Sequence, residues 1–370
     1  MKKVKICFVG NSDSIHVQRW AKYFIGKGYE VHVISEGKNK IEGAMVHNLI
    51  TIGKLKSKLN SVFRPILGLI ITRRIINKIK PDIVHAHYLT SYGFYATAAG
   101  FHPLVVSAWG SDILIRSKKS KILNKVAKFV LKRTDMIHSV SDYLTDELIS
   151  LNANKEKIIT IPIGVSTEKF NSDVNGSKIR KSLGWEDNPV VISTRNFEPI
   201  YNVECLINAI PIVLKYVYGT KFMLLGKGTL ENKLKNMVEE SGISKSVEFI
   251  GSIQHDELPE YLSSADVYVS TSLSDSLGVS NLEAIACGLP VILTDILINK
   301  ELTEKSMNIN LFPIENSKAL AEKIIALIKN KEHQEFKKGN CKIIREIFDW
   351  DKNMRKIEEV YLDLIGENKI

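Results

Sequence analysis

The stretch "SLSDSLGVSNLEAIACGLPVI", residues 272–292, places two carboxylates on either side of a short turn that contains a glycine. Asp275 precedes Gly278, and Glu283 follows eight positions after the first acid. Carboxylate oxygens accept hydrogen bonds from hydroxyl groups but repel phosphates. The pattern therefore favours one acid that holds the hydroxyls of a ribose and another that holds those of a transferred sugar.

The turn between the acids also offers hydrogen-bond donors. "VYVSTS" is typical of a strand and "LEAIACG" of a helix that stops at Gly288, so the backbone N–H groups between the acids lie at the start of a helix. We place Glu283 in the first turn of that helix. Such a helix start suits an anion, here a diphosphate. A purely structural interpretation is equally open, in which Asp275 caps the turn and Glu283 favours the helix dipole.

The elements that must position these residues follow a repeated pattern. Short apolar runs alternate with helical segments, first in "VKICFVG", "EVHVIS", "DIVHAHY", "LVVSAWG", "MIHSVS" and "IITIPIG", then in "PVVISTRN", "KFMLLG", "VEFIGS", "VYVSTS" and "PVILTD". Such runs predict parallel sheets buried on both faces, with ligands beyond the carboxyl ends of the strands.

We therefore expect an α/β protein with two doubly wound, Rossmann-like domains that face each other across a cleft. The N-terminal domain is expected at residues 1–170 and would hold the acceptor. A polar linker follows at 171–188, and the donor domain occupies 189–340. The segment 341–370 has helical periodicity and is expected to cross back to the first domain.

Several segments share one resemblance. The acidic turn is close to "E-S-F-G-x-x-x-x-E-A-M-A-x-G-x-P-V", "LLGKGTLENKL" to a "G-x-G" with a following helix, "IPIGVSTEKF" to "P-N-G-V-D-x-x-x-F", and "STRNFEPIYNVECLINAI" to "G-R-x-x-x-x-K-G". The opening "GNSDSIHVQRWAKYFIGKGYEVHVIS" fits a first strand, loop, helix and strand. Together they resemble the family-4 retaining glycosyltransferases of GT-B fold over nearly the whole chain.

The resemblance implies a set of functional residues. The catalytic residues would be Arg195, Asp275 and Glu283. The diphosphate-sugar donor would be bound by Gly10, Asn11, Arg195, Tyr201, Gly226, Lys227, Ser276, Leu277, Gly278, Val279 and Glu283. The transferred sugar or the acceptor would be contacted by His16, His87, Trp109 and Asp112.

Three positions depart from the family pattern. Asp275 is one methylene shorter than the usual glutamate. Tyr201, followed by Asn202, stands where the family has lysine and glycine, and Trp109 replaces the histidine of "H-G-x-D". The leaving diphosphate thus lacks the positively charged partner that the family lysine provides, and Lys227 is a candidate to replace it. We interpret the chain as an active variant, because Arg195, the glycine turn and the second acid are intact.

Metal and redox chemistry have little support in the sequence. No Asp-x-Asp stands at a strand end, and His85 and His87 lack a nearby third ligand, so we expect no metal. No G-x-G-x-x-G follows the first strand, which argues against a dinucleotide oxidoreductase, and no cofactor is expected. Ordinary packing remains an alternative for His16 and His87, and a plain turn remains one for Trp109 and Asp112.

The charge is unevenly distributed over the chain. Residues 1–170 contain 27 lysines and arginines against 12 acids, while residues 171–370 contain 24 against 29. Two stretches, 54–80 and 116–133, contain no acid, and in the second Lys118, Lys121, Lys125, Lys128 and Lys132 recur at steps of three or four. We expect these stretches to bind an anionic membrane surface. Nucleic acid is the rival partner, but stacking aromatic residues and known motifs are missing.

The expected function is transfer of a hexose or N-acetylhexosamine from a nucleotide-diphosphate sugar, UDP-linked, to a glycan or lipid-linked acceptor, with retention of configuration. Four scattered cysteines and a short apolar start favour the cytoplasm, at the inner face of the membrane. The alternatives are a sugar-nucleotide epimerase of GT-B type and a non-catalytic sugar-nucleotide-binding protein.

Overall fold

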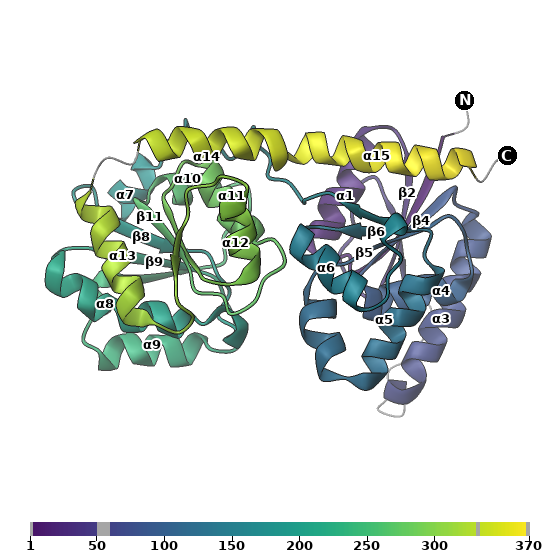
Figure 1. Ribbon diagram of the computed structural model, residues 1–370, viewed down its shortest axis with the longest axis horizontal. Helices are drawn as coiled ribbons and strands as arrows, with labels where there is room; N and C mark the ends of the chain where they lie inside the picture. The colour runs from purple at the N-terminus through teal and green to yellow at the C-terminus, as the bar shows by residue number, and fades with distance from the viewer. Residues whose placement is uncertain (1–2, 50–59, 331–333, 368–370) are drawn as a thin grey trace. The chain divides into compact units, whose positions relative to one another are not determined.

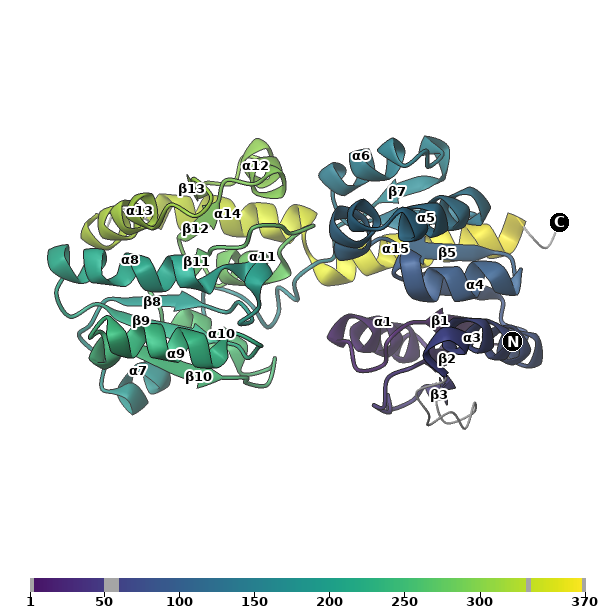
Figure 2. The same ribbon diagram turned by 90° about the horizontal axis from the view of Figure 1, so that it is seen from below.

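The computed structural model describes residues 3–49, 60–330 and 334–367. It divides into two compact units. Unit 1 comprises the chain up to Ile161 together with the residues from Met354 onward, and unit 2 runs from Pro162 to Asn353. Each unit is built on its own parallel sheet (Figures 1 and 2).

Unit 1 contains a seven-stranded sheet in the order β3-β2-β1-β4-β5-β6-β7, and all its strand pairs are parallel. The strands are β1 Lys5–Val9, β2 Glu30–Ser35, β3 Met45–Asn48, β4 Ile83–His87, β5 Leu104–Ser107, β6 Met136–Ser139 and β7 Ile158–Thr160. The helices are α1 Ile15–Gly26, α3 Asn60–Ile79, α4 Phe94–Ala99, α5 Lys121–Arg133, α6 Asp142–Ser150 and most of α15 Trp350–Glu367, with π-helical turns at Leu89–Gly93 and Ser111–Ser117.

Helices cover both faces of this sheet. In Figure 1, α3, α4 and α5 lie on one side, and α1 and α15 lie on the other. The ring of Tyr361 on α15 stacks on Phe24 of α1 with a centroid distance of 5.1 Å, and its hydroxyl hydrogen-bonds to His85 of β4. The last helix of the chain therefore packs on the sheet of unit 1.

Unit 2 contains a six-stranded sheet in the order β10-β9-β8-β11-β12-β13, again fully parallel. The strands are β8 Val190–Ser193, β9 Lys221–Leu225, β10 Val247–Gly251, β11 Val267–Ser270, β12 Val291–Thr294 and β13 Asn310–Phe312. The helices are α7 Ser177–Leu183, α8 Val203–Tyr216, α9 Glu231–Glu240, α10 Leu258–Ser263, α11 Val279–Ala286, α12 Leu297–Glu304, α13 Ser317–Lys329 and α14 Gln334–Ile347.

In unit 2, α8, α9 and α13 cover one face of the sheet, and α10, α11 and α14 cover the other (Figure 1). A buried cluster that includes Val191, Phe222, Val269 and Ile210 fills the first interface. In both sheets the strand order reverses after the first strand, between β1 and β4 and between β8 and β11. The predicted α/β class with two Rossmann-like domains is confirmed, and these reversal points are where such sheets bind ligands.

The unit boundaries differ from the expected ones. The first unit ends at Ile161 rather than at residue 170, because Val165 forms a parallel bridge with Asp349 inside unit 2. The expected linker at 171–188 is also part of unit 2. Its helix α7 packs against the sheet through Arg180, whose guanidinium donates to Asp266 at 2.7 Å, and Gly176 lies against the backbone of Ser264.

Candidate donor site at the carboxyl edge of unit 2

Arg195 lies two residues beyond β8, at the point where the strand order reverses, and it is only 7 % exposed. Its Nε donates to Ser270 Oγ at 2.8 Å, and one of its terminal nitrogens donates to Asn281 Oδ1 at 2.8 Å. The same nitrogen forms an ion pair with Asp275 Oδ2 at 3.0 Å. A guanidinium held by three partners is fixed before any ligand arrives, which suits bidentate binding of a phosphate.

The electrostatics of the site keep Arg195 charged. Burial alone would lower its pKa, but Tyr268, Asp275 and Tyr201 outweigh burial, so the pKa of Arg195 lies above its ordinary value. The ring of Tyr201 lies 5.5 Å from the guanidinium carbon, a cation–π distance. For Tyr201, burial raises the pKa, so its hydroxyl remains a neutral hydrogen-bond donor.

Asp275 closes its own loop. Its Oδ1 accepts hydrogen bonds from the backbone N–H of Ser276 at 2.8 Å and of Gly278 at 3.1 Å, while Oδ2 faces Arg195. The amides of residues 276–279 are expected to bind a diphosphate. Two of these four amides are already hydrogen-bonded to the carboxylate of Asp275 in this structure. Gly278 has φ 66°, and a Cβ there would lie 2.5 Å from Asn281 Nδ2, so glycine is required at this turn.

Glu283 lies in the second turn of α11 rather than in the first, because the helix begins at Val279. Its side chain is nearly buried, and Oε1 is 2.8 Å from Nε2 of His255. His255 lies in the loop between β10 and α10, and sequence reasoning missed it, as it missed Ser270 and Asn281. None of the three belongs to a motif, and only the folded sheet brings them to the acids.

The loop after β9 packs against the segment that carries Arg195. A Cβ on Gly226, whose φ is 153°, would lie 2.6 Å from the carbonyl oxygen of Arg195. The N–H of Phe197 donates to Lys227 O at 3.0 Å. Lys227 itself is exposed, and within the described ranges no ion pair involves it. Its ammonium is therefore available to a ligand at this edge of the sheet.

Tyr201 and Asn202 show how the departures from the family pattern are accommodated. Tyr201 ends a short 3-10 turn and packs against the core cluster of unit 2. Asn202 has φ 46° and ψ 45°, the left-handed conformation that glycine adopts most easily. Asparagine is the side-chain-bearing residue that tolerates this conformation best, so it replaces the family glycine with little strain.

We predict that Asn202→Ala lowers the free energy of unfolding by about 1 kcal/mol, because the Cβ of alanine is strained in the left-handed conformation and alanine has no polar side chain to offset the strain. Asn202→Gly should change it by less than about 0.5 kcal/mol. Urea titrations of the two variants measure the difference. Equal destabilisation by alanine and glycine would contradict this account and point to a contact of the asparagine side chain instead.

In unit 1 the predicted residues also gather at the carboxyl edge, beside the reversal between β1 and β4. A Cβ on Gly10 would lie 3.0 Å from Val17 Cγ2 and 3.2 Å from the His87 ring, so a larger residue there would press on both side chains. Asn11 is exposed, and its side-chain oxygen accepts from the N–H of Asp13 at 3.1 Å. Gly10 is buried and its N–H donates to Ile34 O at 3.0 Å, so Asn11 is the part of this loop that is open to a ligand.

Aromatic rings surround Trp109 after β5. The ring of His16 lies 4.5 Å from Trp109, that of His87 lies 5.5 Å from it, and Tyr88 stacks on it at 6.1 Å. His87 is 1 % exposed, and burial lowers its pKa to about 3, so it is neutral at physiological pH. Trp109, His16 and Tyr88 are half-buried, so part of each side chain is accessible, although Trp109 Nε1 and His16 Nδ1 are buried.

The structure corrects the role expected for Asp112. Its side chain is fully buried, and its two oxygens accept from the N–H of Leu89 at 2.8 Å and of Trp109 at 3.2 Å. Burial raises the pKa of Asp112, although these N–H groups oppose the shift. Asp112 therefore joins two loops and positions Trp109, and it does not itself reach a sugar.

The basic surface differs in detail from its expected form. Lys121, Lys125, Lys128 and Lys132 are exposed on α5, beside Ile122, which is 75 % exposed. The helix begins at Lys121, however, and Lys118 precedes it and pairs with Glu147 at 2.8 Å. Of the stretch 54–80, residues 54–59 lie outside the described residues. No described helix is long and apolar enough to cross a membrane.

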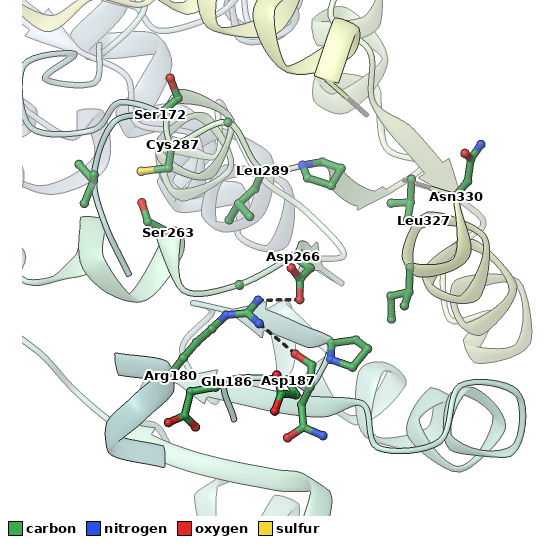
Figure 3. A pocket seen from close by; sticks show the side chains of 17 residues that line it. Ser172, Arg180, Glu186, Asp187, Ser263, Asp266, Cys287, Leu289, Leu327 and Asn330 are labelled. Atoms are coloured by element: carbon green, nitrogen blue, oxygen red, sulfur yellow. Dashed lines mark hydrogen bonds and ion pairs between the residues drawn. The ribbon is translucent and has the colours of Figure 1, made fainter. Parts of the chain in front are cut away.

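A pocket of about 490 Å³ lies elsewhere in unit 2 (Figure 3). It is formed at the amino ends of the strands, beside Pro189, Asp266 and Pro290, and holds none of the predicted site residues. Its arginine, Arg180, is committed to Asp266 and to the carbonyl of Asn188 (Figure 3). We therefore place the donor site at the opposite, carboxyl edge. Among the described residues no cluster of three or more metal-ligating side chains occurs.

Two family models match this chain. Residues 176–340 match the model of "Glycosyl transferases group 1", and residues 5–141 match that of "Glycosyl transferase 4-like". The uncharacterized glycosyltransferase MJ1178 of Methanocaldococcus jannaschii is 27 % identical over 361 residues, which cover 95 % of this chain and 94 % of that protein. The N-acetyl-alpha-D-glucosaminyl L-malate synthase of Bacillus anthracis is 24 % identical over 363 residues, which cover 94 % of this chain and 93 % of that protein.

Solved structures share the fold. HepE of Anabaena, crystallised with UDP and glucose, superposes with a TM-score of 0.81 at 20 % identity, covering 98 % of this chain and all of that one. WaaG, a glycosyltransferase of lipopolysaccharide biosynthesis, gives 0.76 at 14 % identity over 96 % and 99 % of the two chains. The chain belongs to the group 1, family-4-like glycosyltransferases of GT-B fold, which act on sugar-nucleotide donors.

Proposed function

We propose that this protein transfers a hexose or an N-acetylhexosamine from a UDP-linked donor to a glycan or lipid-linked acceptor, with retention of configuration and without a metal or other cofactor. The observation that carries the proposal is Arg195, a buried guanidinium fixed by three partners at the strand reversal of unit 2. HepE, which shares the fold, was crystallised with UDP-glucose, and this supports the choice of nucleotide.

In the proposed reaction the diphosphate takes the place of Asp275 beside Arg195. Negative charge grows on the diphosphate as the bond to the sugar breaks, and a guanidinium fixed in advance stabilises that charge without reorganising. The leaving diphosphate accepts the proton of the acceptor hydroxyl on the face from which it departs. The released Asp275 carboxylate and the amides of its loop are then available to the sugar and the phosphate.

The acceptor is proposed to bind unit 1 at the rings around Trp109. Aromatic side chains combine a large apolar face with few rotatable bonds, which suits the apolar face of a pyranose. His16 lies at the same edge of the sheet and supplies a hydrogen-bonding group to the acceptor. Asn11, in the loop after β1, is kept for the donor.

The test is a nuclear magnetic resonance assay with UDP-hexoses and UDP-N-acetylhexosamines, glycan acceptors and EDTA. The proposal expects transfer in the presence of EDTA, with the anomeric configuration of the donor kept in the product. Conversion of the donor sugar without an acceptor would instead identify an epimerase. Donor binding with neither transfer nor slow donor hydrolysis would identify a binding protein.

The proposed site of action is an anionic membrane surface, bound by α5 and the described part of α3. These helices flank α4 on one side of the sheet, and they expose the lysines of α5 together with Ile66, Ile70 and Ile122. Exposed lysines interleaved with apolar side chains are the pattern of a peripheral membrane face.

The charge-reversal variant Lys121→Glu, Lys125→Glu, Lys128→Glu should no longer sediment with vesicles rich in anionic lipid. Each basic residue near such a leaflet contributes about 1 kcal/mol, so reversing three of them removes several kcal/mol. The wild-type protein should sediment at low salt, leave the vesicles at high salt and ignore neutral vesicles. Lys233→Glu, Lys235→Glu on α9 of unit 2 is the control and should sediment normally. If the wild-type protein does not sediment with anionic vesicles at low salt, the membrane proposal is wrong and the lysines of α5 only form a solvated surface.

A further inference from the structure

Glu283 is a carboxylate with little access to water. Its side chain is 6 % exposed, and a buried carboxylate is costly unless hydrogen bonds satisfy it. In the described part of the chain, the one side chain that bonds this carboxylate is His255, whose Nε2 lies 2.8 Å from Oε1. The second oxygen, Oε2, has no such partner among the described residues.

His255 is held in place by its own neighbours. Its ring packs on Phe170 with a centroid distance of 5.2 Å and an interplanar angle of 51°. The residue after His255, Asp256, and the residue before Phe170, Lys169, form an ion pair. The loop before α10 is further closed by Glu257, which accepts from the N–H of Gln254 at 3.1 Å. The imidazole therefore approaches Glu283 from a fixed direction.

A carboxylate fixed through one oxygen presents the other in a defined orientation. Because Nε2–H occupies Oε1, Oε2 is left to accept hydrogen bonds from a ligand. Arg195 bonds Ser270, Asp275 and Asn281 but not Glu283, so the two acids of the turn serve different parts of a donor. Asp275 lies beside Arg195 and, once a diphosphate displaces it, is available to the transferred sugar, whereas Glu283 is available to other hydroxyls of the donor.

We propose that His255 is a positioning residue, which orients Glu283 so that its free oxygen accepts hydrogen bonds from the vicinal hydroxyls of the nucleotide ribose. This inference rests on the proposed function, because it takes the ligand to be a uridine diphosphate. His255 itself does not touch the donor. Its contribution is seen only through recognition of the ribose.

The experiment compares UDP with 2′-deoxy-UDP by isothermal titration calorimetry. UDP carries a vicinal diol only on its ribose, and the deoxy compound lacks one of those hydroxyls. The wild-type protein should bind UDP roughly tenfold or more tightly than 2′-deoxy-UDP, as expected for a hydrogen bond to a charged acceptor. In His255→Ala this ratio should fall to below about threefold, mainly because UDP binds more weakly.

Two further variants separate positioning from general damage. Glutamine retains an N–H donor, so His255→Gln should restore much of the ratio, whereas a purely structural role would not distinguish alanine from glutamine in this way. His102→Ala is the matched control, because His102 also pairs with a carboxylate, Asp135, but belongs to unit 1 and to none of the predicted sites. It should leave the ratio unchanged. The ratio is internal to each variant, so partial unfolding does not alter it.

The outcomes distinguish the inference from the function on which it rests. A wild-type ratio retained in His255→Ala, but lost in Glu283→Ala, would overturn the role of His255 alone. A ratio unaffected by Glu283→Ala, or a wild-type protein that does not bind UDP, would overturn the donor site and this inference together.

Discussion

Arg195→Ala should lower turnover about 10²- to 10³-fold and weaken donor binding much less. The reason is that charge develops on the leaving diphosphate in the transition state, where a fixed guanidinium acts most strongly. Steady-state kinetics with saturating donor measure turnover, and calorimetry measures the affinity for UDP. Arg195→Lys should be intermediate, because an ammonium keeps the charge but cannot reach Ser270 and Asn281 together.

The alanine variant also leaves Asp275 without its cation, so a moderate loss of stability is expected and the melting temperature must be recorded with the kinetics. A folded Arg195→Ala protein that loses affinity and turnover in equal measure would show that the arginine binds the ground state and the transition state alike. Near-normal turnover would remove Arg195 from the site.

Glu283→Ala should reduce turnover divided by the Michaelis constant of the donor more than about 100-fold. Several hydroxyl contacts depend on this carboxylate, and their loss affects both binding and the orientation of the reacting bond. Glu283→Gln keeps the size and one acceptor oxygen, so its loss should be smaller.

The control for Glu283 is Glu231→Ala, which removes an exposed ion pair with Lys235 on α9 and should leave the kinetics unchanged. A folded Glu283→Ala protein with near-normal kinetics would contradict the assignment of the acidic turn to the donor.

The central strands could be predicted from the sequence because they are buried on both faces. β1, β4, β8 and β11 are four or five residues long and almost wholly apolar or buried, which leaves few alternatives to a parallel sheet. The edge strands β3 and β13 were missed. Both are short and only partly buried, so their sequences carry no continuous apolar run.

The proximity of Arg195 and Asp275 was predictable, because they follow neighbouring strands and the carboxyl ends of parallel strands meet at one edge. The ion pair between them was not predicted. His255 could not be found this way, because it is 28 residues from Glu283 and nothing in its surroundings marks it as a partner. Asp112 was assigned to the ligand because its position after β5 fits, and burial, which sequence does not reveal, decided otherwise.

Calorimetric titration with UDP in the presence of EDTA tests most directly that the donor binds at the carboxyl edge of unit 2. The wild-type protein should bind UDP, Glu283→Ala should bind it much more weakly, and Arg195→Ala should show a smaller loss. Asp187→Ala, in the pocket at the amino edge, should bind like the wild type. UDP binding that survives in the double variant Arg195→Ala, Glu283→Ala but is lost in Asp187→Ala would contradict the account.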